Sequence, residues 1–173
     1  MNQKEFCENI LPLKDRLYRY AQSIVKRESI ARDIVQDTMI AAWEKIDKIE
    51  EVRNIEAWCM VVVRNSALKK LRSDKVLMVD LNDYVRMKSH RPDPYRQLEN
   101  KDGLELVGRI IEALPQMQRE VIVLRDIENY SYKEIGVIMN IEINHVKVLI
   151  HRARLAVRSE MKKIYDHGVT QAQ

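Results

Sequence analysis

Two aspartates, Asp33 and Asp37, are four residues apart in a segment with helical periodicity, which places both carboxylates on one helix face. Such a pair can hold a divalent cation, but no histidine or third carboxylate motif elsewhere completes a metal site. His145 and His151 do not share a helix face. The sequence has no glycine-rich phosphate loop, no GxSxG and no HExxH motif. We therefore expect no enzyme, no metal and no cofactor.

A basic stripe near the end of the chain carries the clearest chemical signal. It lies on a helix expected from about Asn144 to Tyr165, beside an apolar stripe on the same helix. Immediately upstream, Ser131 and Glu134 match a capping box that begins a short helix. A capped short helix, a tight turn and a long basic helix form the helix-turn-helix layout, whose second helix enters the major groove of DNA. A solvated amphipathic surface helix is the alternative for the stripe alone.

The elements that position these residues are expected to be helices. Gly and Pro total eight of 173 residues, too few for the turns of a many-stranded sheet. Helical periodicity predicts helices at approximately 4–26, 29–49, 55–72, 104–114, 116–127, 132–139 and 144–165. We expect an all-α fold of two small helical domains joined by a flexible linker. The expected boundaries are 1–75 for the first domain, 76–100 for the linker, 101–166 for the second domain and 167–173 for a tail.

Single residues mark several predicted helix ends. Ser29 and Asn54 are candidate N-caps, and Asn140 can adopt the left-handed conformation that ends a helix. Pro115 fits the first turn of a helix. Gly136 lies inside a short helix, where it costs about 1 kcal/mol relative to Ala, so we expect a close approach of the neighbouring helix there.

Charge is distributed unevenly along the chain. Residues 28–56 carry four basic and eight acidic side chains, whereas 64–75 carry five basic and one acidic, and 144–163 carry six basic and one acidic. This indicates different partners on different surfaces. Two distant cysteines favour a reducing compartment, and the longest uncharged apolar run, 57–63, is too short for a bilayer. We expect a cytoplasmic protein without direct membrane insertion.

The C-terminal segment LPQMQREVIVLRDIENYSYKEIGVIMNIEINHVKVLIHRARLAVR resembles region 4 of extracytoplasmic-function sigma factors, which belong to the sigma-70 family. IARDIVQDTMIAAWEKI resembles the polymerase clamp-binding helix of region 2, and EAWCMVVVRNSALKKLR resembles its −10-reading helix. The resemblance covers about residues 5–165. It implies a protein that binds core RNA polymerase, through the β′ clamp and the β flap, and promoter DNA, and that is controlled by an anti-sigma factor.

The resemblance also implies site residues. The clamp-binding residues would be Asp33, Gln36, Asp37, Ile40 and Glu44. The −10 DNA-binding residues would be Arg53, Asn54, Arg64, Asn65, Lys69 and Arg72, with the loop 50–54 forming a pocket for an extruded base. The −35 DNA-binding residues would be Asn144, His145, Lys147, Val148, His151, Arg152, Arg154 and Arg158.

Three positions depart from the family pattern, and one rival function stays open. Lys69 stands where Asp is frequent, Glu142 where Ser commonly caps the recognition helix, and Ile143 is unusual at an exposed helix start. These departures leave the promoter sequence undetermined. Trp58 could stack on a base, but its apolar surroundings favour core packing. The rival function is a helix-turn-helix regulator that acts without polymerase core.

Overall fold

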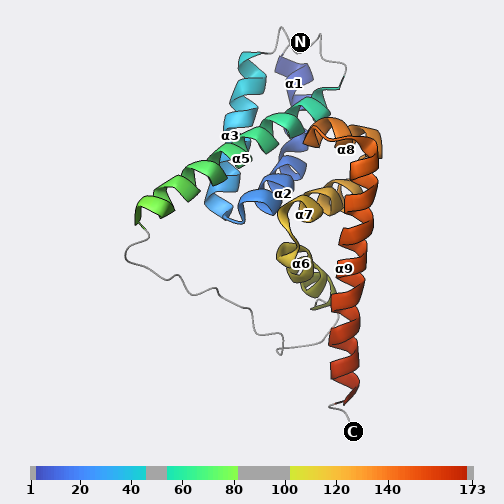
Figure 1. Cartoon of the computed structure of the whole chain (residues 1–173). Coiled ribbons are helices and arrows are strands. Elements are labelled where there is room, and N and C mark those ends of the chain that lie inside the picture. Colours follow the sequence, from blue (N-terminus) through green and yellow to red (C-terminus); the bar gives the residue numbers. More distant parts are fainter. Residues whose placement is uncertain (1–2, 46–53, 82–101, 171–173) are drawn as a thin grey trace.

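The computed structural model describes residues 3–45, 54–81 and 102–170, and within these ranges the regular structure is helical. In chain order the elements are α1 (Gln3–Asn9), a 3-10 turn η1 (Leu11–Leu13), α2 (Lys14–Val25), α3 (Glu28–Glu44), α5 (Ile55–Leu81), α6 (Asp102–Ala113), α7 (Gln116–Ile122), a π-helical segment η2 (Val123–Ile127), α8 (Tyr132–Met139) and α9 (Ile143–Thr170). The all-α prediction is confirmed (Figure 1).

The first domain is built from α1, α2, α3 and α5. The single helix expected over 4–26 is wrong, because Pro12 interrupts it and η1 separates α1 from α2. Lys26 ends α2 in the left-handed conformation, with φ 56°. Ser29 is not the N-cap of α3. Arg27 takes that position with extended backbone, and Ser29 lies within the first turn.

Two helices are longer than the periodicity predicted. The helix α5 continues past residue 72 to Leu81, into the predicted linker, and α9 continues to Thr170, into the predicted tail. No Gly or Pro occurs between 73 and 81 to end α5. The rest of the predicted linker, 82–100, and the end of the helix expected over 29–49 lie outside the described residues.

The second domain is built from α6 to α9. Pro115 is the N-cap of α7 rather than its first helical residue. The helix expected over 116–127 changes at Val123 from α to π hydrogen bonding, and Asn129 then turns the chain with φ 62°. The helix α9 packs along α7, α8 and α6, and its buried face includes Val146, Ile150 and Ala153 (Figure 1).

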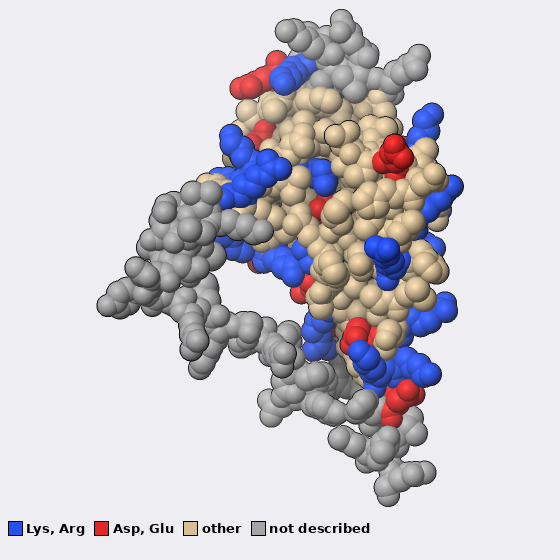
Figure 2. Space-filling view, viewed as in Figure 1, with Lys and Arg blue, Asp and Glu red and all other residues tan. Residues whose placement is uncertain are grey.

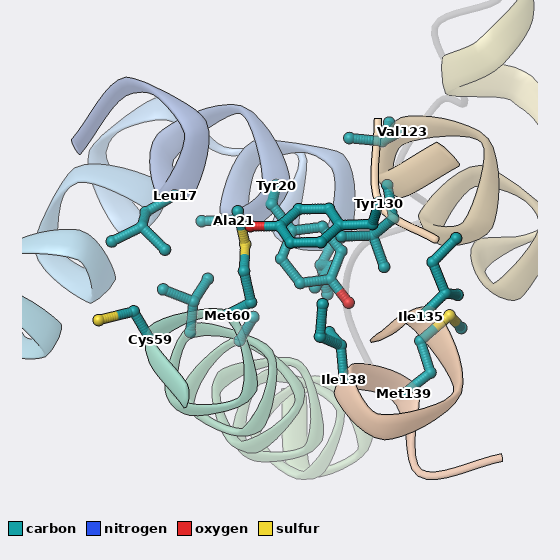
Figure 3. Packing of buried hydrophobic residues seen from close by; sticks show 14 of the residues in the cluster. Leu17, Tyr20, Ala21, Cys59, Met60, Val123, Tyr130, Ile135, Ile138 and Met139 are labelled. Carbon is teal, nitrogen blue, oxygen red and sulfur yellow. The ribbon is translucent and has the colours of Figure 1, made fainter. Parts of the chain in front are cut away.

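The two domains pack directly against each other. The helix α2 lies against α7, and α5 lies against α8. Leu17, Tyr20 and Met60 from the first domain belong to the same buried cluster as Val123 and Ile138 from the second (Figure 3). The sequence had left the relative orientation of the domains open, and the structure places them in one compact arrangement.

Candidate DNA and polymerase interfaces

The helix-turn-helix has the local geometry that the sequence predicted. The Ser131 hydroxyl accepts a hydrogen bond from the Glu134 backbone N–H at 3.2 Å, and the Glu134 carboxylate accepts one from the Ser131 backbone N–H at 2.8 Å. The Ser131 hydroxyl also donates to the Glu134 carboxylate at 2.7 Å. This bond, followed by the bond from the Ser131 backbone N–H, lowers the pKa of Glu134 below its ordinary value. Asn140 ends α8 with φ 52°. A Cβ on Gly136 would lie 3.0 Å from the Ile141 carbonyl oxygen, so a larger residue there would push the tight turn away by a few tenths of an ångström.

The outer face of α9 is open to solvent. All eight predicted −35 residues are exposed, and Val148 is the one apolar side chain among them, with 44% of its surface accessible. Figure 2 shows Lys and Arg side chains along the edge that α9 forms and a second group over α5. An exposed cationic helix of this kind can follow the phosphates of a DNA groove.

One cation on this face is held by an acid of its own domain. The Arg154 guanidinium donates to both carboxylate oxygens of Asp126, from Nε at 3.1 Å and from Nη2 at 2.5 Å. This pairing raises the pKa of Arg154. Both side chains are partly exposed, so the pair is weak in water and a phosphate can replace the carboxylate.

The predicted −10 residues on α5 divide into two groups. Asn65, Lys69 and Arg72 are exposed and recur at the spacing of one helix face. Asn54 caps α5, since its Oδ1 accepts the Ala57 backbone N–H at 2.9 Å, which confirms the predicted cap. Arg53 and the rest of the predicted base pocket, 50–52, lie outside the described residues.

Arg64 has a different environment from its neighbours. Its side chain is only 13% exposed, and its Nε donates to the Glu120 carboxylate at 2.7 Å. Glu120, at 0% exposure, lies in the second domain. Trp58 is partly buried against the core, with the Lys45 ammonium 5.9 Å from its ring centre. Trp58 thus packs against the core, as we expected, with part of its side chain accessible.

Sequence reasoning missed a set of charged residues between the domains. Glu128 is 4% exposed and accepts hydrogen bonds from Arg16 Nε at 2.9 Å and Arg19 Nε at 2.6 Å. Arg119 is buried and donates to the backbone carbonyls of Ser23, Glu112 and Leu114. Burial lowers the pKa of Arg119. The only sequence signal for these roles was acidic or basic residues in otherwise apolar segments, such as Glu120 beside VIVL.

The predicted clamp-binding face of α3 is open. Asp33, Gln36, Asp37 and Glu44 are exposed, and Ile40 among them is 49% exposed, while Ile34 on the opposite side of α3 is buried in the core. An apolar side chain surrounded by polar acceptors is suited to a protein partner. A groove of about 700 Å³ adjoins this face and includes Gln36 and Met39 in its lining.

Within the described part of the chain, no three His, Cys, Asp or Glu side chains gather as a metal site. The described helices also include none of the length and apolarity that crossing a membrane requires.

Residues 10–76 match the family Sigma-70 region 2, and residues 104–157 match Sigma-70, region 4. The chain is 27% identical over 172 residues to the ECF RNA polymerase sigma factor SigW of Bacillus subtilis, covering 94% of this chain and 92% of that protein. It is 27% identical over 155 residues to the ECF RNA polymerase sigma factor SigM of the same organism, with coverages of 88% and 90%.

Two solved structures share the fold. One is the sigma factor RpoE in complex with the anti-sigma factor NepR from Bartonella quintana, with a TM-score of 0.73, 27% identity and coverage of 92% of this chain and 98% of that chain. The other is CnrH in complex with the cytosolic domain of CnrY, with a TM-score of 0.64, 24% identity and coverages of 94% and 90%. With both regions matched in order, the chain belongs to the sigma-70 family and, within it, to the extracytoplasmic-function sigma factors.

Proposed function

We propose that this sigma factor binds core RNA polymerase through the exposed face of α3 and directs it to promoters whose −10 and −35 elements are read by α5 and α9. The observation that carries the proposal is the exposure of all three faces at once. On each of the three faces, the residues proposed to bind lie mostly outside the buried core that the two domains share. The protein acts by binding and positioning, and the phosphodiester chemistry belongs to the polymerase.

The −35 reading rests on α9. Groove recognition needs base-reading groups near the start of the helix and cations beside them for the phosphates. Asn144 and Val148 supply the first kind, a polar amide and an apolar group that can contact a thymine methyl, and both are exposed. Lys147, Arg154 and Arg158 supply the second kind. The β flap of the polymerase is the proposed protein partner of this domain.

The −10 reading rests on Asn65, Lys69 and Arg72, with Arg64 available once it leaves Glu120. Extruding a base from a stacked strand costs a few kcal/mol, which the protein must offset by contacts to the captured strand. Because Trp58 is partly buried against the core, the proposed contacts are polar and cationic rather than aromatic. We assign residues 1–75 to clamp and −10 binding and 101–166 to −35 binding.

Control by an anti-sigma factor is part of the proposal. One structural relative, the sigma factor RpoE, was co-crystallised with the anti-sigma factor NepR, and its match covers 92% of the present chain, which includes both domains. A corresponding partner would bind the compact arrangement seen here. The proposed place of action is the cytoplasm, where polymerase and promoter DNA meet.

Run-off transcription with purified core polymerase on genomic fragments tests the proposal. The expected result is a discrete set of start sites that depend on the added chain. Copurification of the chain with polymerase, in the same preparation, distinguishes a sigma factor from a helix-turn-helix regulator that acts without core. Absence of both start sites and copurification would refute the proposal.

A further inference from the structure

Two buried carboxylates of the second domain receive basic side chains of the first. Glu120 accepts hydrogen bonds from Arg64 Nε at 2.7 Å and the Tyr20 hydroxyl at 3.2 Å, and Gln116 of its own helix donates at 3.0 Å. Burial, followed by the charge of Glu120, raises the pKa of Tyr20 well above its ordinary value. The phenol therefore stays protonated and remains a donor to Glu120.

Glu128 forms the second contact. Arg16 and Arg19, one turn apart on α2, both donate to its carboxylate, and Arg16 also donates to the Glu128 backbone carbonyl at 2.5 Å. Arg16 in addition pairs with Glu56 of α5, which accepts the hydroxyl of Tyr130. We call Glu120 and Glu128, with Arg64, Arg16 and Arg19, the interdomain clasp.

The domains share apolar contacts, such as those of Leu17, Met60 and Ile138, but the ion pairs of the clasp, set among these contacts, are typical of an interface that opens. A permanent interface is more stable with apolar side chains in place of buried ion pairs. The charged groups of the clasp instead become hydrated when the domains part, which lowers the free-energy cost of separating the domains. The clasp also sets the register of the closed form, because a buried carboxylate that loses its partner is strongly unfavourable. Salt screens such buried pairs less than exposed ones.

The closed form cannot read a promoter. The names −10 and −35 denote positions about 25 base pairs apart on the DNA, which at about 3.4 Å per base pair is roughly 85 Å. In the closed form α5 packs on α8, and packed helices have axes about 8–10 Å apart. The α8–turn–α9 unit that would read −35 is therefore held beside the helix that would read −10. Opening must come before both elements are bound.

Arg64 links this geometry to DNA binding. Among the predicted −10 residues that the structure describes, Arg64 is the one whose side chain is mostly buried. Its partner there is the carboxylate of Glu120. A carboxylate on a guanidinium occupies the place that a phosphate would take. Glu120 and a DNA phosphate therefore compete for the same donor.

We propose that the interdomain clasp holds the free chain in a closed, self-inhibited state in which Glu120 occupies Arg64 in place of promoter phosphate. Core polymerase or promoter DNA opens the clasp by binding the separated domains. The role of Arg64 in this inference rests on the proposed function. The closed state itself does not, because it is a property of the chain alone.

Small-angle scattering of the full chain tests the closed state without polymerase. The expected radius of gyration of the wild type is about 16 Å, the value for a compact chain of this length. Glu120→Lys with Glu128→Lys places like charges in the clasp and should raise this radius by about a third or more, with helicity by circular dichroism unchanged. The matched control, Glu105→Lys with Glu142→Lys, reverses two exposed acids of the same domain and should leave the radius unchanged.

A milder pair of variants tests the competition at Arg64 and does not depend on the charge-reversed chain folding. Glu120→Gln should raise affinity for a single-stranded −10 oligonucleotide about fivefold, Glu105→Gln should not, and the gain should vanish in an Arg64→Gln background. Three results would each contradict the clasp. They are an extended wild-type chain, a charge-reversed chain that stays compact with intact helicity, and a gain in oligonucleotide affinity that does not depend on Arg64. Transcription by the wild type with core polymerase is scored separately, so failure of the sigma function is distinguishable from failure of the clasp.

Discussion

The guanidinium of Arg154 on α9 lies in a two-bond contact with the carboxylate of Asp126, which belongs to η2 of the same domain. The contact holds the arginine against its own domain before DNA is present. Because both partners are partly exposed, the pair contributes at most about 1 kcal/mol. A phosphate can therefore take over the guanidinium at little cost, and the geometry pre-orients it.

Arg154→Ala is expected to weaken binding of holoenzyme to promoter duplex and to lower the slope of log affinity against log salt by about 0.9, the value for one lost phosphate contact. Asp126→Asn should act oppositely, raising affinity a few-fold, because it frees the guanidinium. Titrations by fluorescence anisotropy at several salt concentrations measure both. Arg109→Ala, at an exposed position on α6, is the control for loss of one positive charge. An unchanged slope for Arg154→Ala would exclude the phosphate contact.

Positive charge introduced on the α3 face should prevent assembly with polymerase. Asp33→Lys with Gln36→Lys is expected to reduce affinity for core enzyme at least a hundredfold, since two cations would replace an anion and a polar acceptor on an exposed face and remove its charge complementarity to the proposed partner. Ile40→Ser should cost about tenfold, or about 1.4 kcal/mol, by removing the apolar contact. Surface plasmon resonance with immobilised core gives the affinities, and Glu105→Lys serves as control. Wild-type affinity in the double variant, with normal helicity, would refute the clamp assignment.

Local structure was predictable where one residue decides it. Ser131, Glu134, Asn54 and Asn140 each satisfy free backbone groups at a helix end, and such caps depend on neighbours in the sequence alone. The break at Pro12 was equally local, but the apolar 3-4 pattern that continues through it obscured it. Ser29 failed as a cap because Arg27 already has the extended backbone that begins α3.

The packing of the domains was not predictable in this way. Arg64 and Glu120 are 56 residues apart, and each alone looks like one more charged residue on an amphipathic helix. Only the fold shows that α2 and α5 bring their basic side chains to the acids of α7 and of the turn after η2. The exposed faces were easier to predict, because a helical-wheel projection of α3 or α9 separates apolar from polar residues without knowledge of binding partners.

The capping box offers a test of stability and of its pH dependence. Ser131→Ala should lower the free energy of unfolding by about 1 kcal/mol at pH 7. The hydrogen bond from Ser131 depresses the pKa of Glu134, so its stabilisation is present above the unfolded-state value of about 4.3 and is lost as pH falls through the lower folded value. The gap between wild type and variant should therefore narrow below about pH 4. Urea unfolding at both pH values measures it. Ser159→Ala, at an exposed position inside α9, should lack this effect, and a pH-independent gap would contradict the assignment.

The two cysteines should differ in reactivity, because Cys7 is exposed and Cys59 is buried. Burial, followed by the nearby charge of Glu56, raises the pKa of Cys59 to about 11. At pH 8 we expect Ellman's reagent to modify one thiol in the folded chain and two in urea. The neutral Cys59 thiol stabilises the fold fully below the unfolded-state pKa of about 8.5, and that contribution is lost as pH rises toward 11.

Two variants assign the thiols. Cys59→Ala should remove the slowly modified thiol and this part of the alkaline destabilisation, whereas Cys7→Ala should remove only the rapidly modified thiol. Rapid modification of both thiols in the native chain would show that α5 does not pack as described.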